Sequence, residues 1–536
     1  MENSIVSKKR IIILGGGFAG ANTAMQLERK LRRREDVEIV LVSKENYMVF
    51  QPMLPEIISG NIGILDTVTP IRRMAPNTQL YLRDVETVDV QNQTVELSPG
   101  MDASSTVLEY DQLIVALGNV ADFRRAPGLH DHAFPFKNLV HALRLRDHLI
   151  RVLSEAAITD DPNLRKQLLT FVIGGGGFSG VEVCAELNDF VRDCAQRYFK
   201  LDSSEVRVVL VHAGERILNR EMPESLGMYA QKLLQKRGVE FIFNMQLESA
   251  TPECAIMADG KRIPTRTLVS SVPSSPNPVV LNLAVPLERG RIKSDLKLQV
   301  EGFDNIWALG DCALIPNPEA EGFCPPTAQF AVRQAKTCAH NVAASLDGKP
   351  QSNFTFSELG KMASLGHRRA IIRLFDRFNI HGFMAWVIWR MAYWVKLPGF
   401  DRKVKVGISW LIDIICGREL VQTGMDTPTS LIEAHFESDE MIVHQGDPQT
   451  GVSIILAGKA SVLRADSDGN SQVVAELRAG DCFGVKEFLD RSPAQESIQC
   501  TEKLDIVTYT QKELEPLLLL PEIRRSFENL RSQDKE

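Results

Sequence analysis

Two short glycine-rich segments carry the clearest chemical signal in this sequence. Residues 15–20 read GGGFAG after the apolar run 11–14, and residues 175–180 read GGGFSG after the apolar run 171–173. A turn of this kind, between a buried strand and a helix, presents backbone N–H groups and the positive end of the helix dipole to a phosphate. Two such turns predict two dinucleotide sites in one chain. Two dinucleotides held together indicate electron transfer, most often from a nicotinamide to a flavin.

The glycines of each turn have different roles. Gly15 allows the tight bend, Gly17 lets a pyrophosphate approach the backbone, and Gly20 lets the helix pack closely on the strand. The second turn repeats this spacing with Gly175, Gly177 and Gly180. A turn that only packs a helix on a strand is the alternative, and the flanking elements disfavour it.

Two further strand ends favour a flavin. Residues 115–118 (VALG) end a strand on small residues and on Gly118, as is needed where the backbone lies near a bound ring. Residues 306–311 (IWALGD) end on a Gly-Asp pair, and the carboxylate of Asp311 can accept hydrogen bonds from ribityl hydroxyls. The Gly-Asp pair is a common turn by itself, but it is far more specific after two glycine turns.

Composition excludes several classes of protein. A chain of 536 residues is too long for one core. Its net charge of −7 argues against a general nucleic-acid binder. The nine cysteines show no C-x-x-C and no metal-ligand spacing, which indicates reduced thiols and no metal site. We expect no signal peptide, because the first strand follows a short charged N-terminus, and no membrane-spanning helix, because no apolar run reaches about 18 residues.

From residue 8 to about residue 420 the chain resembles the type II, non-proton-pumping NADH dehydrogenases, which are flavoproteins with two dinucleotide-binding domains. The resemblance rests on residues 46–54 (NYMVFQPML), on the Gly-Asp pair at 310–311 and on residues 325–331 (PPTAQFA). It implies FAD at the first glycine turn and NADH at the second, with reducing equivalents passed to a membrane quinone from the cytoplasmic face of the cell membrane.

The resemblance also implies roles for individual residues. Asp311 would hold the flavin, and Ala328 and Gln329 would lie where the quinone head group meets the flavin. Glu182, just after the second glycine turn, would lie near the nicotinamide and the flavin. Glu182 and Gln329 are therefore the candidates for guiding protons and quinone during catalysis.

Four residues depart from the family pattern. Ser43 stands where an acid usually binds the flavin adenosine ribose, and Pro273 replaces a glycine near the flavin. Arg333 stands where many members have the second glutamine of the quinone motif, and Gln334 lies one position later than that glutamine. The fourth is His212, at the strand end where NAD enzymes usually place an acid. A neutral histidine would bond a ribose hydroxyl, whereas a cationic one, helped by Arg216, would favour a 2′-phosphate, so NADPH stays open beside NADH. A solvent-facing histidine is the third interpretation.

Four of the five tryptophans lie between residues 386 and 410, among other apolar residues. From Gly366 to Val406 there are nine Lys or Arg and two acids. Aromatic and cationic residues beside an apolar stripe are typical of the headgroup region of a bilayer. We expect the helical segment 382–395, with a second helix at 409–416, to lie on a membrane surface, although a core helix pair or a homodimer interface has the same composition.

The last part of the chain resembles a cyclic nucleotide-binding domain, in segments such as 445–447 (QGD), 480–481 (GD) and 483–484 (FG). Two ligand residues of that family are replaced. Val485 stands where an acid would bind the ribose hydroxyl, and Ala494 stands where an arginine would bind the phosphate. We expect the fold without ordinary cyclic AMP binding, and a structural or interaction role in its place.

The predicted fold class is therefore α/β, with two Rossmann-like dinucleotide-binding domains, one inserted in the other, a helical membrane-surface segment and a C-terminal β-roll. The expected regions are 8–125 and 286–350 for the FAD-binding domain, 126–285 for the NAD(P)H-binding domain, 351–424 for the membrane-surface or dimerisation helices, and 425–536 for the cyclic-nucleotide-binding-like domain.

The expected activity is FAD-dependent NAD(P)H:quinone oxidoreduction without proton pumping. Two alternatives remain, namely a soluble NAD(P)H:acceptor reductase and a flavin-based redox sensor whose output is the C-terminal domain. Cysteine-dependent relatives are disfavoured, because no cysteine occurs before residue 184 and because Cys312 and Cys324 fit no redox pair.

Overall fold

The computed structural model describes residues 8–100, 104–121, 128–271, 274–356, 358–397, 400–415, 431–447, 451–465, 471–490 and 492–510, with Leu514 and Arg525. The chain divides into two compact units. Unit 1 is Met1–Asp122, Lys137–Ala142 and Pro273–Glu419, and unit 2 is Phe123–Phe136, Leu143–Val272 and Leu420–Glu536. Unit 1 thus resumes earlier than residue 286, where the sequence suggested the second part of the flavin domain. Pro273 itself lies outside the described residues.

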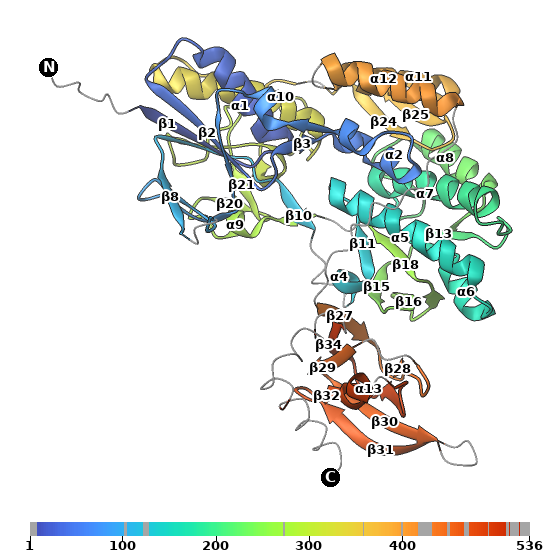
Figure 1. Cartoon of the computed structure of the whole chain (residues 1–536). Helices are drawn as coiled ribbons and strands as arrows, with labels where there is room; N and C mark the ends of the chain where they lie inside the picture. The colour runs from blue at the N-terminus through green and yellow to red at the C-terminus, as the bar shows by residue number, and fades with distance from the viewer. Residues whose placement is uncertain are drawn as a thin grey trace. The chain divides into compact units, whose positions relative to one another are not determined.

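The core of unit 1 is a five-stranded parallel sheet in the order β22-β9-β1-β2-β5. Its strands are β22 (Ile306–Ala308), β9 (Gln112–Val115), β1 (Lys9–Leu14), β2 (Val37–Ser43) and β5 (Gln79–Leu82). The central strands are almost wholly apolar because helices cover both faces of such a sheet. Helices α1 (Phe18–Leu31) and α10 (Ala328–Leu346) pack against each other in this unit (Figure 1).

Smaller elements complete the flavin-side part of unit 1. They are β3 (Tyr47–Val49), η1 (Gln51–Met53), α2 (Leu54–Ser59), η2 (Ile64–Thr67), β4 (Val68–Pro70), α3 (Ile71–Met74), β6 (Val85–Asp89), β7 (Thr94–Leu97), β8 (Thr106–Glu109), β20 (Leu287–Glu288), β21 (Arg291–Lys293), η3 (Gly310–Cys312) and β23 (Ala313–Leu314). Strands β10 (Asn119–Ala121) and β19 (Ser274–Pro276) form an antiparallel pair where the chain leaves and re-enters the unit. A short helix, α9 (Pro278–Leu281), follows this pair.

The last part of unit 1 combines a three-stranded antiparallel sheet with two helices. The sheet contains β24 (Gly360–Ser364), β25 (Ala370–Leu374) and β26 (Phe378–Gly382), and the helices are α11 (Phe383–Lys396) and α12 (Phe400–Ile415). The expected second helix at 409–416 is the end of α12, which begins nine residues earlier; Cys416 lies outside the described residues. No helix of the described ranges is long and apolar enough to cross a bilayer.

Unit 2 contains a second five-stranded parallel sheet, in the order β11-β18-β12-β13-β14. Its strands are β11 (Ala133–Pro135), β18 (Thr267–Ser270), β12 (Thr170–Gly174), β13 (Arg207–Val211) and β14 (Val239–Ile242). The helices are α4 (Leu129–His132), α5 (Leu139–Ile158), α6 (Pro162–Leu168), α7 (Phe178–Arg197) and α8 (Glu224–Lys236). An antiparallel meander of β15 (Leu247–Ala250), β16 (Cys254–Met257) and β17 (Arg262–Pro264) follows β14.

The C-terminal part of unit 2 consists of two four-stranded antiparallel sheets, β27-β34-β29-β32 and β28-β33-β30-β31. Its elements are β27 (Leu431–Phe436), β28 (Met441–Val443), β29 (Gly451–Ala457), β30 (Lys459–Ala465), β31 (Ser471–Arg478), β32 (Cys482–Phe483), α13 (Val485–Asp490), β33 (Ser497–Cys500) and β34 (Leu504–Thr510). The predicted β-roll has this architecture.

Candidate active site

The first glycine turn joins β1 to α1 and leaves room for a phosphate. A Cβ atom built at Gly15 would lie 2.4 Å from the carbonyl oxygen of Ala116, and one at Gly20 would lie 1.8 Å from that of Gly15. These two glycines therefore allow close packing of the backbone, and Gly15 also has a φ of +105°. At Gly17, in contrast, no atom lies within 4 Å of the Cβ position. The turn thus has open space at the position where a pyrophosphate would approach.

The carboxyl ends of the parallel strands bring the other flavin candidates to the same edge of the sheet. Gly118, with a φ of +65° and open space at its Cβ position, follows β9. Asp311 follows β22, where its Oδ2 accepts a long hydrogen bond (3.5 Å) from the side-chain amide of Asn119. The Nζ of Lys137 donates to the carbonyl oxygen of Asn119 at 2.8 Å. Ser43 ends β2 and lies against the turn, with its Oγ 2.2 Å from the Cβ position of Gly16.

Burial dominates the electrostatics around Asp311. It raises the pKa of this carboxyl group, an effect that the nearby Lys137 and Arg291 partly oppose. Burial also lowers the pKa of Lys137. A buried carboxylate with one long hydrogen bond is suited to accept hydrogen bonds from hydroxyl groups, as ribityl hydroxyls would supply. The residues at this edge of the sheet therefore fit FAD.

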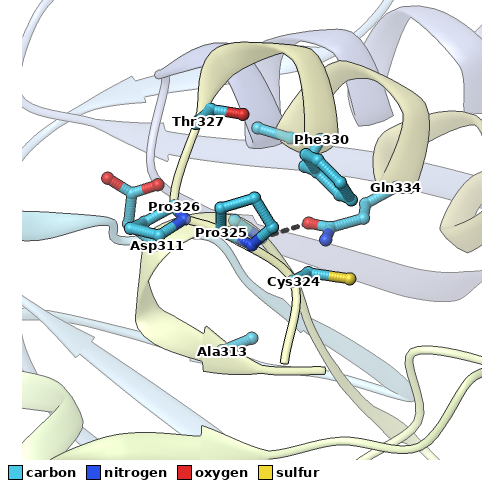
Figure 2. Close-up of a pocket in the computed structure, with 10 residues that line it drawn as sticks. Asp311, Ala313, Cys324, Pro325, Pro326, Thr327, Phe330 and Gln334 are labelled. Carbon is cyan, nitrogen blue, oxygen red and sulfur yellow. Dashed lines mark hydrogen bonds between the residues drawn. The ribbon is translucent and has the colours of Figure 1, made fainter. Parts of the chain in front are cut away.

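A small pocket lies beside the Gly-Asp pair (Figure 2). It is lined by Gly310, Asp311, Ala313, Cys324, Pro325, Pro326, Thr327, Phe330, Ala331 and Gln334. The Oε1 of Gln334 accepts a hydrogen bond of 2.9 Å from the backbone N–H of Gly310, drawn as a dashed line in Figure 2. Gln334 therefore fixes the turn that positions Asp311. The sequence indicated only that this glutamine is one position late for the quinone motif.

Helix α10 begins beside this pocket. Its N-cap, Thr327, makes no side-chain hydrogen bond to the first turn, so the first backbone N–H groups, including that of Ala328, lack a side-chain cap. The side-chain amide of Gln329 donates to the carbonyl oxygen of Gly360 at 3.1 Å and so joins α10 to β24. Arg333 is exposed, and its guanidinium lies 5.4 Å from the ring centroid of Phe356.

The second glycine turn, in unit 2, joins β12 to α7. Gly175 has a φ of +110°, and a Cβ at Gly180 would lie 2.0 Å from the carbonyl oxygen of Gly175. His212, at the end of β13, contacts this turn directly: its Nδ1 accepts a 3.1 Å hydrogen bond from the backbone N–H of Gly176. The imidazole therefore packs on the turn, and its role in nucleotide binding stays a prediction. Glu182 lies half-buried on α7, and its predicted place near the nicotinamide and flavin stays a prediction.

The cysteines near the flavin-side pocket are buried thiols. Cys312 and Cys324 are both free, and burial raises the pKa of each thiol to about 11. Both are therefore protonated and unreactive at neutral pH. Among the described residues there is no group of side chains suited to hold a metal ion.

Helices α11 and α12 carry exposed apolar side chains on one part of unit 1. The exposed residues are Phe383, Met384, Met391, Val395, Val404 and Ile408. The buried face of α11 packs Ala385 and Trp389 against the sheet β24–β26. Arg390 is buried too, and it pairs with Glu56 of α2 at 3.4 Å while its guanidinium lies 4.5 Å and 4.4 Å from the rings of Trp386 and Trp410.

In the C-terminal domain, the two replaced ligand positions are occupied by buried apolar side chains. Val485 belongs to a cluster with Val452, Phe488 and Leu514. The backbone of Ala494 exchanges hydrogen bonds with the 446–447 turn. Neither position supplies a charged group, so the absence of ordinary cyclic AMP binding stays a prediction with a physical reason.

Comparison with known proteins agrees with this geometry. The pyridine nucleotide-disulphide oxidoreductase family matches residues 9–335, the NDH2 C-terminal domain matches residues 359–419, and the cyclic nucleotide-binding domain matches residues 433–519. Since the first of these covers more than half of the chain, the fold and the glycine turns define a flavoprotein of the pyridine nucleotide-disulphide oxidoreductase class. Within that class, the chain belongs to the type II NADH:quinone oxidoreductases.

Three relatives illustrate the match. The demethylphylloquinone reductase NdbB of Synechocystis sp. is 30% identical over 413 residues, which cover 76% of this chain and 96% of that protein. The type II NADH:quinone oxidoreductase Ndh of Mycobacterium tuberculosis is 29% identical over 427 residues, which cover 77% of this chain and 89% of that protein. The structure of NDH2 from Plasmodium falciparum in complex with NADH has a TM-score of 0.71 at 19% identity, and covers 77% of this chain and all of that one.

Proposed function

We propose that the protein is a membrane-peripheral enzyme that oxidises NADH and reduces a membrane quinone through bound FAD, without pumping protons. The observation that carries this proposal is the presence of two glycine turns of dinucleotide-binding geometry in one chain. FAD would supply the redox chemistry, as the acceptor of a hydride and the donor of two electrons. The protein's residues bind, orient and shield the reactants.

The residues of unit 1 would each hold a part of the FAD. The open side of Gly17 and the first N–H groups of α1 would receive the pyrophosphate, because the helix dipole is positive there. Asp311, held in place through the turn that Gln334 fixes, would accept hydrogen bonds from the ribityl chain. The N–H groups at the start of α10, beginning with Ala328, would face the electron-rich end of the flavin ring.

The quinone would meet the flavin near Gln329. Its amide already joins α10 to β24, the first strand of the sheet on which α11 packs. The start of α10 is therefore connected, through the sheet β24–β26, to helix α11 with its exposed apolar residues. We assign Gln329 to positioning the quinone head group, and Glu182 to the nicotinamide side.

We assign membrane docking to α11 and α12. Exposed apolar side chains such as Met384 and Ile408 lie on helices that also carry Arg402, Lys403 and Lys405, and such a surface binds anionic lipid headgroups. A homodimer through the same helices is the competing use of this surface. The docking surface would admit a lipid-soluble quinone without exposing it to water.

A steady-state assay with two acceptors tests the proposal. NADH oxidation is followed with a quinone in anionic vesicles and, separately, with a water-soluble dye. We expect turnover with both, and co-sedimentation of the protein with the vesicles. Turnover with the dye but not with quinone would support the soluble reductase, and very slow turnover with both would support the redox sensor.

Docking is tested by a charge placed on the proposed surface. Met384→Glu and Ile408→Glu should reduce co-sedimentation and quinone turnover, while dye reduction stays unchanged. Val473→Glu, at an exposed valine of the C-terminal domain, is the matched control, because Met384 and Val473 are almost equally exposed (63% and 64%). If the protein dimerises in solution and Met384→Glu makes it monomeric without affecting vesicle binding, the surface is a dimer interface.

A further inference from the structure

The pyridine-nucleotide site lacks the acid that usually ends the second strand, and His212 does not replace it. The Nδ1 of His212 accepts from the Gly176 N–H, so the ring proton lies on Nε2, which faces the Oδ1 of Asn219 at 3.3 Å. Both ring nitrogens are therefore engaged with the protein. In this arrangement His212 fastens the glycine turn to the loop after β13.

Arg216 is also engaged within this loop. Its guanidinium donates to the carbonyl oxygens of Ile217 (3.1 Å), Leu218 (3.0 Å), Asn219 (3.4 Å) and Met222 (3.0 Å). The backbone N–H of Leu218 in turn donates to the carbonyl oxygen of Gly176 at 2.7 Å. The suggestion from the sequence that Arg216 would help to bind a 2′-phosphate is therefore not supported, since this side chain holds residues 217–222 against the glycine turn.

The loop that is held in this way places a carboxylate at the glycine turn. The Oε1 of Glu221 lies 3.0 Å from the Cβ position of Gly177, the glycine beside which a dinucleotide would pass the turn. The other oxygen, Oε2, accepts a 3.2 Å hydrogen bond from the backbone N–H of Arg220, which orients the carboxylate. The equivalent position at the flavin-side turn, Gly17, has no atom within 4 Å.

We propose that Glu221 supplies the missing acid, so that its carboxylate accepts hydrogen bonds from the adenosine ribose of NADH and disfavours the 2′-phosphate of NADPH. This inference rests on the proposed function only in assigning a pyridine nucleotide to this site. A carboxylate selects between the two nucleotides because it accepts from a hydroxyl but repels a phosphate. Arg220, the exposed neighbour on the same loop, carries a positive charge that would oppose this selection.

The test is calorimetric titration of the oxidised holoprotein with NAD⁺ and with NADP⁺. Both ligands contain the adenosine ribose, and their binding requires neither flavin reduction nor quinone. For the wild type we expect tighter binding of NAD⁺. In Glu221→Gln the Kd for NAD⁺ should rise by about tenfold or more, as for a lost hydrogen bond to a charged group. The ratio of the Kd for NADP⁺ to the Kd for NAD⁺ should become smaller at the same time.

Arg220→Gln is the matched control, since it changes the adjacent side chain and keeps the backbone N–H; it should leave the Kd for NAD⁺ unchanged. Equal binding of NAD⁺ and NADP⁺ by the wild type, or an unchanged preference in Glu221→Gln, would overturn the proposal. A preference that Glu221→Gln abolishes would support it even if flavin reduction by NADH were absent. An absence of flavin reduction by NADH would contradict the proposed function and leave the role of Glu221 intact.

Discussion

The ion pair between Glu56 and Arg390 connects the flavin-side part of unit 1 to the α11 helix, and its removal should have a large effect. The side chains are 3% and 9% exposed and their charged atoms are 3.4 Å apart. Deleting one partner of a buried pair costs about 3–5 kcal/mol, because the other charge stays buried without its counter-ion. At about 2–4 °C per kcal/mol, Arg390→Met should lower the Tm of the holoprotein by roughly 10 °C.

The assay is thermal unfolding in detergent, with Lys405→Met as the control for the loss of an exposed cation on the neighbouring helix. The double variant Glu56→Gln/Arg390→Met should lose less stability than the sum of the two single variants, since it removes both charges. We expect Arg390→Met to reduce quinone turnover more than dye turnover, because α11 is the element that loses its anchor. An unchanged Tm, or strictly additive effects in the double variant, would refute this reasoning.

The remaining predictions concern pH and the replaced ligand positions. Burial raises the pKa of Asp311, so the contribution of this group to the stability of the flavin-free protein is lost as the pH rises through that pKa. At neutral pH the flavin-free Asp311→Asn variant should therefore unfold at a higher temperature than the flavin-free wild type. The same variant should bind FAD poorly. Burial lowers the pKa of His148 from 6.5 to about 4, so stability should fall as the pH falls between these values, and His148→Gln should flatten that part of a Tm-against-pH curve. Cyclic AMP should not change the Tm of the wild type. If the domain lacks only the two charged side chains that bind the ribose and the phosphate, cyclic AMP should raise the Tm of the double variant Val485→Glu/Ala494→Arg. A shift in the wild type would contradict our interpretation of the C-terminal domain.

Much of the architecture could be predicted from the sequence because the local signals agree with the tertiary fold. A strand covers each of the two apolar runs, 11–14 and 171–173, and a helix begins within each of the two glycine segments, as the sequence predicts. The helix expected at 382–395 is α11, shifted by one residue at each end. These elements have strong periodicity, and the glycine spacing fixes how each strand meets its helix.

The side-chain network of the sites could not be predicted in the same way. Glu56 and Arg390 are 334 residues apart, and no local pattern connects them. Glu221 resembles any acid of a polar loop until the structure places it at Gly177. Gln334 looked displaced by one residue from a quinone motif, whereas its hydrogen bond to Gly310 shows a role in the flavin-side turn. In each case the contact depends on where distant segments meet, which a single sequence does not report.

The most direct test of the central claim is an anaerobic stopped-flow experiment on the purified holoprotein. One equivalent of NADH is added while the flavin absorbance is followed, and a quinone in vesicles is added afterwards. We expect NADH to bleach the flavin absorbance rapidly and quinone to restore it rapidly. Protein that contains no flavin and takes up no added FAD, or flavin that NADH does not bleach, would contradict it.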